Sequence, residues 1–85
     1  MWEVFLTAQA AKDVPKLKNA RLDSKAKALL AVMRNNPFQN PPPYEKLRGY
    51  AARYSRRINR QHRLVYEVDE QAREIVVLAM WTHYE

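Results

Sequence analysis

The chain opens on a period-two pattern of hydrophobic and polar residues. Trp2, Val4 and Leu6 share one side of this pattern, which predicts a first strand over residues 2–7. Phe5 makes the second side apolar as well. Because a strand that is apolar on both faces is typical of a sheet interior, we expect this strand to be central or covered on both sides.

Helical spacing follows this strand. Ala10, Val14 and Leu17 lie at i, i+4 and i+7, and Thr7 can cap the start of a helix. Pro15 interrupts the pattern, because it lacks a backbone donor and clashes with the carbonyl four residues earlier. We therefore expect two short helical segments here in place of one straight helix.

A second helix is predicted to begin at Asp23, which is a favourable N-cap residue. An apolar stripe at i, i+3, i+4 and i+7 continues it, formed by Ala26, Leu29, Leu30 and Met33. The run Asn35-Asn36-Pro37 is a strong stop signal. We interpret the helices as cover for one face of a sheet and assign them no chemistry.

The segment Pro37–Pro43, PFQNPPP, cannot form a helix or a central strand, because three successive prolines exclude the first and disfavour the second. We expect an ordered loop that crosses between the two halves of the domain. A short turn over Tyr44–Gly49 follows, in which Gly49 can adopt a positive φ.

Three strands are predicted over the rest of the chain. Tyr54–Asn59 and His62–Val68 form a hairpin, and Glu74–Thr82 is apolar on both faces, as a central strand is. The order is β-α-α-β-β-β, which predicts an α+β fold with two N-terminal helices packed on a small antiparallel sheet. A length of 85 residues gives one domain, 1–85.

Charge changes this picture from fold towards function. Fifteen Lys and Arg oppose nine Asp and Glu, for a net charge of +6, and seven of the basic residues lie in 46–63 with no acid among them. Such clustering favours a polyanionic partner such as a nucleic acid, an anionic membrane surface or an acidic protein. Without cysteine, disulfides and thiolate metal sites are excluded. No apolar run is long enough to span a membrane, and the N-terminus lacks a signal peptide's basic start, so we expect a cytoplasmic protein.

RNA cleavage without a metal needs a base for the ribose 2′-hydroxyl, cations for the phosphate and an acid for the leaving 5′-oxygen. A metal route is poorly supported, because the chain has two histidines and no carboxylate cluster with ligand spacing. Glu45 is the candidate base, although the sequence alone favours a carboxylate that only neutralises Lys46 or Arg48. His83, at the end of an apolar strand, is the candidate acid, unless it is a frayed terminal residue.

Arginines supply the candidate phosphate contacts. Arg63 lies on a predicted strand, where its guanidinium can bind phosphate in a bidentate manner. Arg56 and Arg57 are adjacent, so strand alternation sends them to opposite faces, one towards RNA and the other towards the fold or another partner. His62 could be a second candidate acid, but we expect it to cap the hairpin turn. Three tyrosines could stack on bases: Tyr54, Tyr66 and Tyr84. For Tyr66, however, we expect packing in the core.

The segments PFQNPPPYEKLRG, YSRRINRQHRLVY and MWTHYE closely resemble the YoeB (Txe) toxins of bacterial toxin–antitoxin modules, within the RelE/ParE superfamily. The resemblance is specific over 37–85 and compatible in layout over 1–36. It implies a RelE-like fold and an endoribonuclease that cuts mRNA in the ribosomal A site, without a metal or cofactor. The expected products are a 2′,3′-cyclic phosphate and a 5′-hydroxyl.

The resemblance also implies roles for individual residues. The general base falls on Glu45, the phosphate-binding arginine on Arg63, the general acid on His83 and a nucleotide-positioning tyrosine on Tyr84. Further RNA or phosphate contacts are expected from arginines in and beside the hairpin: Arg48, Arg56, Arg57 and Arg60. Two departures are the segment 49–53, one residue longer than in some relatives, and Glu85, an acid after the usual terminal tyrosine.

Expected partners are mRNA on the ribosome, rRNA and a cognate antitoxin of the YefM/Axe type, in a heterocomplex or beside a toxin homodimer. Two other functions fit the same sequence. A ParE-like toxin would inhibit DNA gyrase and cut no RNA, whereas a non-catalytic RNA-binding module would depend on its arginines and not on His83. Glu45 together with His83 and Tyr84 favours the nuclease.

Overall fold

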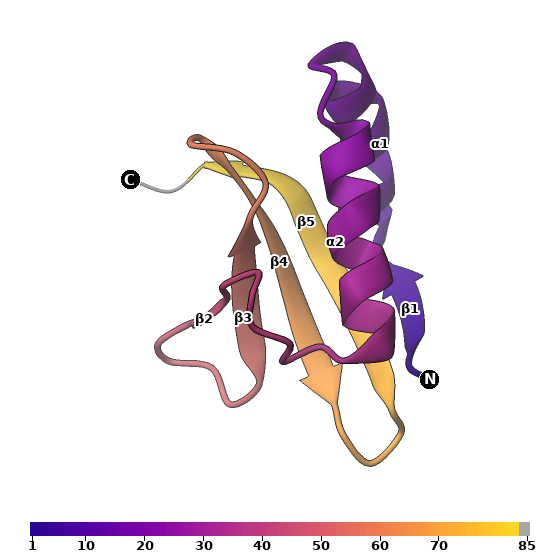
Figure 1. Ribbon diagram of the computed structural model, residues 1–85, viewed down its shortest axis with the longest axis vertical. Helices are drawn as coiled ribbons and strands as arrows, with labels where there is room; N and C mark the ends of the chain where they lie inside the picture. Colours follow the sequence, from indigo (N-terminus) through magenta and orange to yellow (C-terminus); the bar gives the residue numbers. More distant parts are fainter. Residues whose placement is uncertain (84–85) are drawn as a thin grey trace.

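A computed structural model describes residues 1–83, except for the side chain of His83; Tyr84 and Glu85 lie outside the described residues. Two helices pack on a mixed sheet (Figure 1). The elements, in chain order, are β1 Glu3–Leu6, α1 Ala8–Asn19, α2 Asp23–Asn35, β2 Glu45–Lys46, β3 Arg53–Arg57, β4 His62–Asp69 and β5 Glu74–His83. The predicted order is confirmed, with one short additional strand, β2, inside the predicted turn.

The sheet has five strands in the order β1-β5-β4-β3-β2. All neighbours are antiparallel except β1 and β5, which pair in parallel, so the predicted antiparallel sheet is corrected to a mixed one. The predicted central position of the last strand is confirmed, since β5 lies between β1 and β4. Strands β1 and β5, far apart in sequence, thus pair at one edge of the sheet.

The expected central position of the first strand is wrong. β1 is an edge strand, and the side chains of Phe5 and Leu6 remain 45% and 43% exposed. The apolar pattern on both faces shows that the residues suit a pleated sheet, but it carries no information about pairing on the far edge. At four residues, β1 is short, as many edge strands are.

The prediction of two short segments for the first helix is also wrong, because α1 continues through Pro15. The predicted cap is confirmed: Thr7 Oγ1 accepts a hydrogen bond from the Ala10 amide at 3.1 Å. Pro15 lies on the exposed side, while Ala10, Asp13 and Leu17 are buried on the sheet side. Packing of that buried side against β5 offsets the lost backbone hydrogen bond.

The second helix differs from expectation at its start. Leu22 occupies the N-cap position without a side-chain hydrogen bond, and Asp23 is the first helical residue. There its carboxylate favours the helix through the macrodipole and not as a cap. The helix ends at Asn35, as the stop signal predicts.

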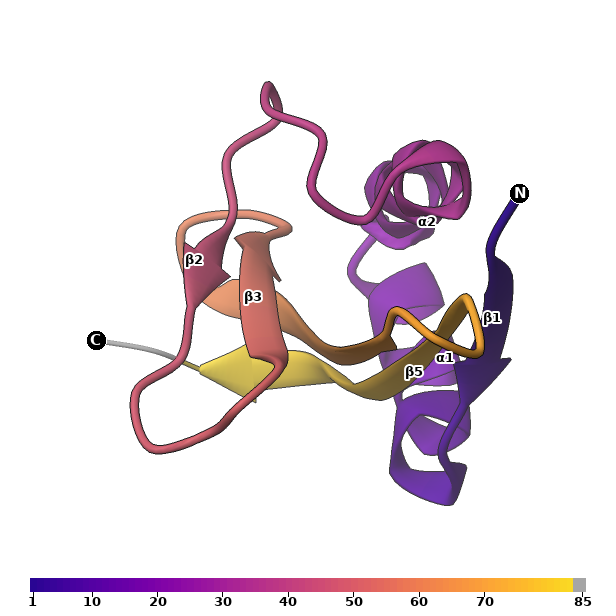
Figure 2. The same ribbon diagram turned by 90° about the horizontal axis from the view of Figure 1, so that it is seen from below.

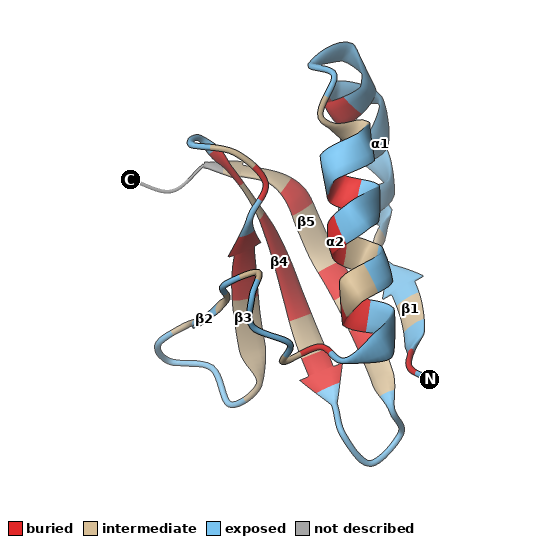
Figure 3. Ribbon diagram, in the orientation of Figure 1, coloured by how far each residue is buried: buried red, intermediate tan, exposed pale blue. Residues whose placement is uncertain are grey.

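The core lies between the helices and the middle of the sheet. Figure 3 shows buried positions along β4, β5 and the inward side of α1 and α2, and these include Leu17, Met33, Leu64 and Val77. Both helices cover the β1–β5 half of the sheet, while the predicted crossing loop runs from α2 towards β3 (Figures 1 and 2). No helix within the described residues is long and apolar enough to cross a membrane.

Candidate functional site

Strand β3 divides its residues between two environments. Its register pairs Tyr54 with Tyr66 and Arg56 with Leu64, and these residues face the core and the proline-rich loop. Because side chains alternate along a strand, Ser55 and Arg57 point to the other face. The predicted separation of Arg56 from Arg57 is therefore confirmed: Arg57 is exposed and Arg56 is fully buried.

Arg56 holds the proline-rich loop against β3. Its guanidinium donates to the carbonyl oxygens of Pro42 at 2.6 Å, Pro37 at 2.9 Å and Gln39 at 2.9 Å. Nη1 and Nη2 are thus engaged by backbone carbonyls, and the residue is fully buried, so this side chain has no surface for a phosphate. The expectation that Arg56 binds RNA is thus corrected, because burial commits the residue to the fold.

The opposite face of β3 carries an ion pair. Arg63 Nη1 lies 2.6 Å from Glu45 Oε1 and 3.4 Å from Ser55 Oγ. The Glu45 side chain is 67% exposed, whereas that of Arg63 is 16% exposed. The ion-pair partner of Glu45 is therefore Arg63 from β4, in place of Lys46 or Arg48, the two neighbours considered from the sequence. A rigid strand presents the arginine, and an accessible carboxylate stands beside it.

These residues surround an open hollow of about 340 Å³. Its lining consists of Pro43, Tyr44, Glu45, Ser55, Arg57 and Arg63. The register explains this grouping, since Glu45 pairs with Ser55 across β2–β3 and Arg57 pairs with Arg63 across β3–β4. An anionic group in the hollow would meet two guanidinium groups beside one carboxylate.

The candidate acid lies next to this hollow along the backbone. Strand β5 ends at His83, whose Cα pairs with that of His62, and the preceding Thr82 pairs with Arg63. The strand end predicted for His83 is confirmed. The roles expected for its side chain and for Tyr84 lie outside the described residues.

His62 does not cap the hairpin turn with its side chain. Its imidazole is buried and stacks on Trp81, with ring centroids 3.7 Å apart. The turn is closed by Asn59 Oδ1, which accepts from the amides of Gln61 and His62 at 2.9 and 2.7 Å. Arg60 at the tip of this turn is exposed, as is Arg48 after β2.

Tyr66 belongs to the core, as expected. It is fully buried, and its hydroxyl donates to the Pro37 carbonyl at 2.9 Å. Burial raises the pKa of the Tyr66 phenol, and the nearby Arg56 guanidinium opposes that rise. Within the described residues, no group of three or more acidic, histidine or cysteine side chains could hold a metal ion.

Sequence reasoning did not find Pro43, Tyr44 or Ser55 as site residues. Ser55 gives no signal in the sequence, since its role depends on the register between β3 and β4. Tyr44 offered a weak signal, an aromatic residue directly before the candidate base. The short strand β2, which brings both Tyr44 and Glu45 to the sheet edge, was expected to be a turn.

Comparison with known proteins decides the family. A protein-family model described as "YoeB-like toxin of bacterial type II toxin-antitoxin system" matches residues 7–84. The chain belongs to the YoeB-like toxins. The match covers both the segment with specific resemblance and the helical half whose layout was only compatible. A search of curated protein sequences finds no match.

Solved structures of YoeB proteins have the same fold. A YoeB/ParE toxin from Agrobacterium tumefaciens is 28% identical, with a TM-score of 0.85 over 96% of this chain and 99% of that chain. A YoeB dimer from Staphylococcus aureus is 30% identical, with a TM-score of 0.83 over 98% of both chains. The RelE toxin in the Escherichia coli RelBE complex, at 21% identity and a TM-score of 0.80 over all of both chains, shares the fold alone.

Proposed function

We propose that this YoeB-like toxin is an endoribonuclease that cuts mRNA on the ribosome by general acid–base catalysis, without a metal. One observation carries the proposal: the exposed Glu45 carboxylate contacts Arg63 at 2.6 Å on the wall of a hollow that Arg57 also lines. A base, two phosphate-binding groups and space for a nucleotide therefore meet at one place. The family supports the same chemistry.

In the proposed reaction, Glu45 takes the proton from a ribose 2′-hydroxyl. The 2′-oxygen then attacks the adjacent phosphorus, and the bond to the 5′-oxygen breaks. Arg63 and Arg57 stabilise the extra negative charge on the phosphate. His83 protonates the leaving 5′-oxygen, and Tyr84 positions the nucleotide; the products are a 2′,3′-cyclic phosphate and a 5′-hydroxyl.

The Glu45–Arg63 ion pair places the guanidinium on the wall of the hollow. Nη1 donates to Glu45 and to Ser55, and a guanidinium stays charged in such contacts, so it attracts a phosphate electrostatically. The same contact holds the Glu45 carboxylate in place before RNA arrives. We also assign exposed Arg48 and Arg60 to the RNA-binding surface, where they add electrostatic attraction.

A reconstituted translation reaction tests this function. Wild type is compared with His83→Ala and Glu45→Gln, with and without ribosomes. Because acid–base catalysis typically contributes 10²–10⁴-fold, we expect each variant to lose roughly that factor in cleavage rate. Full activity in both variants would contradict the mechanism. No cleavage by wild type would favour gyrase inhibition or simple RNA binding.

We further propose an antitoxin of the YefM type as partner, presenting an acidic segment to the basic surface. A structure of a YoeB–YefM complex from Staphylococcus aureus, 31% identical over 99% of both chains, supports this choice. Co-purification of the toxin with the product of an adjacent gene, followed by its loss in high salt, would test the electrostatic part of the interaction.

A further inference from the structure

Ser55 is a buried polar residue of the hollow to which the proposed chemistry assigns no role. It lines the hollow although it is only 1% exposed, so it lies at the base and not at the rim. The sheet register places it directly opposite Glu45 of β2 on one side and Val65 of β4 on the other. Arg63 lies two residues before Val65, on the same face and diagonally across from Ser55. Ser55 is therefore a neighbour of both the candidate base and the phosphate-binding arginine.

One nitrogen of Arg63 contacts both neighbouring side chains. Nη1 donates to Ser55 Oγ at 3.4 Å and to Glu45 Oε1 at 2.6 Å. Glu45 has a long side chain that is 67% exposed and belongs to a two-residue edge strand, whereas the Ser55 side chain is short, buried and inside the sheet. The hydroxyl is therefore the more rigid partner. Its distance is long for a hydrogen bond, but such contacts often tighten only when the substrate is bound.

The proposed reaction changes the charge of only one of these two acceptors. When Glu45 takes the proton of the 2′-hydroxyl, its carboxylate becomes a neutral acid, and its charge–charge attraction to Arg63 ends. At the same stage the phosphate gains negative charge and depends most on Arg63. The Ser55 hydroxyl neither gains nor loses a proton in this step. Its contact with Nη1 therefore persists while the contact with Glu45 weakens.

We propose that Ser55 is a positioning residue, whose hydroxyl holds Arg63 Nη1 at the phosphate while Glu45 carries the proton. This inference rests on the proposed function and deepens it. Ser55 acts through Arg63 and does not touch the reacting atoms. Its contribution is larger in the transition state than in the substrate complex, because the Glu45 carboxylate is still charged in the latter. Loss of the hydroxyl should thus lower kcat more than it raises KM.

Steady-state cleavage of ribosome-bound mRNA tests this role. Ser55→Ala removes the hydroxyl, and we expect kcat to fall about 10-fold, the weaker end of the range for a hydrogen bond to a charged group, with KM within about 2-fold of wild type. Ser55→Thr keeps a hydroxyl and should restore most of the rate. Ser24→Ala is the matched control, because it makes the same change at an exposed position of α2. Urea denaturation of each variant shows that the rates belong to folded protein.

A second measurement does not depend on cleavage. Glu45→Gln carries a neutral side chain and so represents the stage at which Glu45 holds the proton. A dinucleotide with a 2′-O-methyl group, which cannot be cut, is titrated by NMR into wild type, Ser55→Ala, Glu45→Gln and the double variant. We expect Ser55→Ala to raise the Kd about 2-fold in the wild-type background and about 10-fold in the Glu45→Gln background. Such coupling requires that both residues act on the same group, which a purely structural role of Ser55 would not give.

Equal factors in the two backgrounds would overturn the inference, since Ser55 would then act independently of the charge on Glu45. An unchanged kcat for folded Ser55→Ala, with active wild type, would overturn it too and leave the nuclease proposal standing. Conversely, the expected coupling in dinucleotide binding, with no cleavage by wild type, would support the positioning of Arg63 by Ser55 and refute the nuclease.

Discussion

Two buried charged side chains, Asp13 and Arg56, connect different parts of this molecule. Asp13 is 1% exposed and lies between α1 and β5; Arg56 is 0% exposed and lies between β3 and the proline-rich loop. Backbone groups bind both charges: the Met80 amide donates to Asp13, and three carbonyl oxygens accept from Arg56. One of them supports the scaffold, and the other supports the segment that carries the candidate base.

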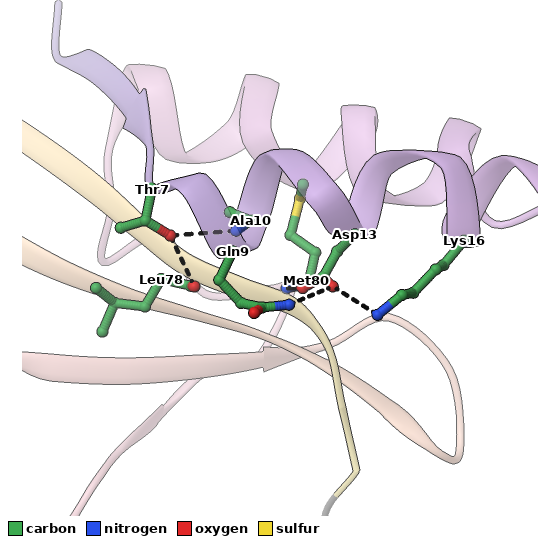
Figure 4. A network of polar contacts seen from close by, with 7 residues as sticks. All are labelled: Thr7, Gln9, Ala10, Asp13, Lys16, Leu78 and Met80. Carbon is green, nitrogen blue, oxygen red and sulfur yellow. Dashed lines mark hydrogen bonds and ion pairs between the residues drawn. The ribbon is translucent and has the colours of Figure 1, made fainter.

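Asp13 completes an edge that β1 leaves open. The pairing of β1 with β5 ends at Val77, and beyond it Thr7 Oγ1 donates to the Leu78 carbonyl at 2.9 Å. Asp13 Oδ2 then accepts from the Met80 amide at 2.9 Å, while Oδ1 accepts from Gln9 and Lys16 (Figure 4). Helix α1 thereby satisfies the polar groups of the β5 edge.

Arg56 lies beneath the site. The last of its three carbonyl partners, Pro42, precedes Tyr44 by two residues and Glu45 by three. Its guanidinium also lies over the Tyr44 ring. The comparison teaches that buried charge can serve stability alone or stability and function together, depending on which segment it fixes. Separate substitutions can distinguish these two cases.

The largest effect is expected from Arg56→Met, which keeps much of the side-chain volume but removes the Arg56 donors of the Pro42 and Gln39 carbonyls and leaves the Pro37 carbonyl with Tyr66. We expect a loss of about 3 kcal/mol in the free energy of unfolding, measured by urea denaturation. Cleavage should fall as well, at a temperature where the variant is folded, because the segment leading to Glu45 is no longer fixed. Arg57→Met, on the exposed face, is the control for stability.

A smaller effect is expected from Asp13→Ala, which removes the acceptor of the Met80 amide. Hydrogen bonds to charged groups contribute about 1.5–3 kcal/mol, so we expect a loss of about 2 kcal/mol in urea. Cleavage per folded molecule should stay at the wild-type level. A reduced rate in the folded variant would show that α1 also shapes the site.

Two matched variants sharpen this second test. Lys16 is 49% exposed, and its contact with Asp13 is long, at 3.4 Å. We therefore expect Lys16→Ala to change stability by less than about 0.5 kcal/mol. Asp13→Asn keeps a side-chain oxygen for the Met80 amide. Its loss in the free energy of unfolding should therefore lie between the losses of Lys16→Ala and Asp13→Ala, unless the charge itself carries the interaction.

Local sequence patterns predicted most elements of this fold but not the long-range contacts. The period-two and helical patterns placed both helices, the hairpin and the β5 strand, because those signals depend on neighbours in the chain. The edge position of β1 and its parallel pairing depend on residues some seventy positions away. The continuation of α1 through Pro15 likewise depends on packing against β5.

The candidate site shows the same division. Glu45 and Arg63 were found because residue type and family resemblance point to them, and the structure brings them together at 2.6 Å. The structural role of Arg56 was only one of two options that strand alternation left open. The register of three strands, which the sequence does not encode locally, decides that Ser55 and Tyr44 join the same hollow.

A smaller effect than that of Asp13→Ala is expected from Tyr66→Phe, which removes one donor to the Pro37 carbonyl that Arg56 also binds. We expect a loss of about 1 kcal/mol in the free energy of unfolding near neutral pH, because Arg56 still satisfies that carbonyl.

The Tyr66 phenol adds a pH dependence to this difference. Its pKa is raised in the folded state, so its contribution is fully present below the unfolded pKa of about 10 and is lost as pH rises through the folded value. Urea unfolding at pH 7 and above pH 10 should therefore show the difference between wild type and Tyr66→Phe shrinking at alkaline pH. A difference that grows with pH would contradict this sign and would mean that Arg56 stabilises the phenolate more than burial disfavours it.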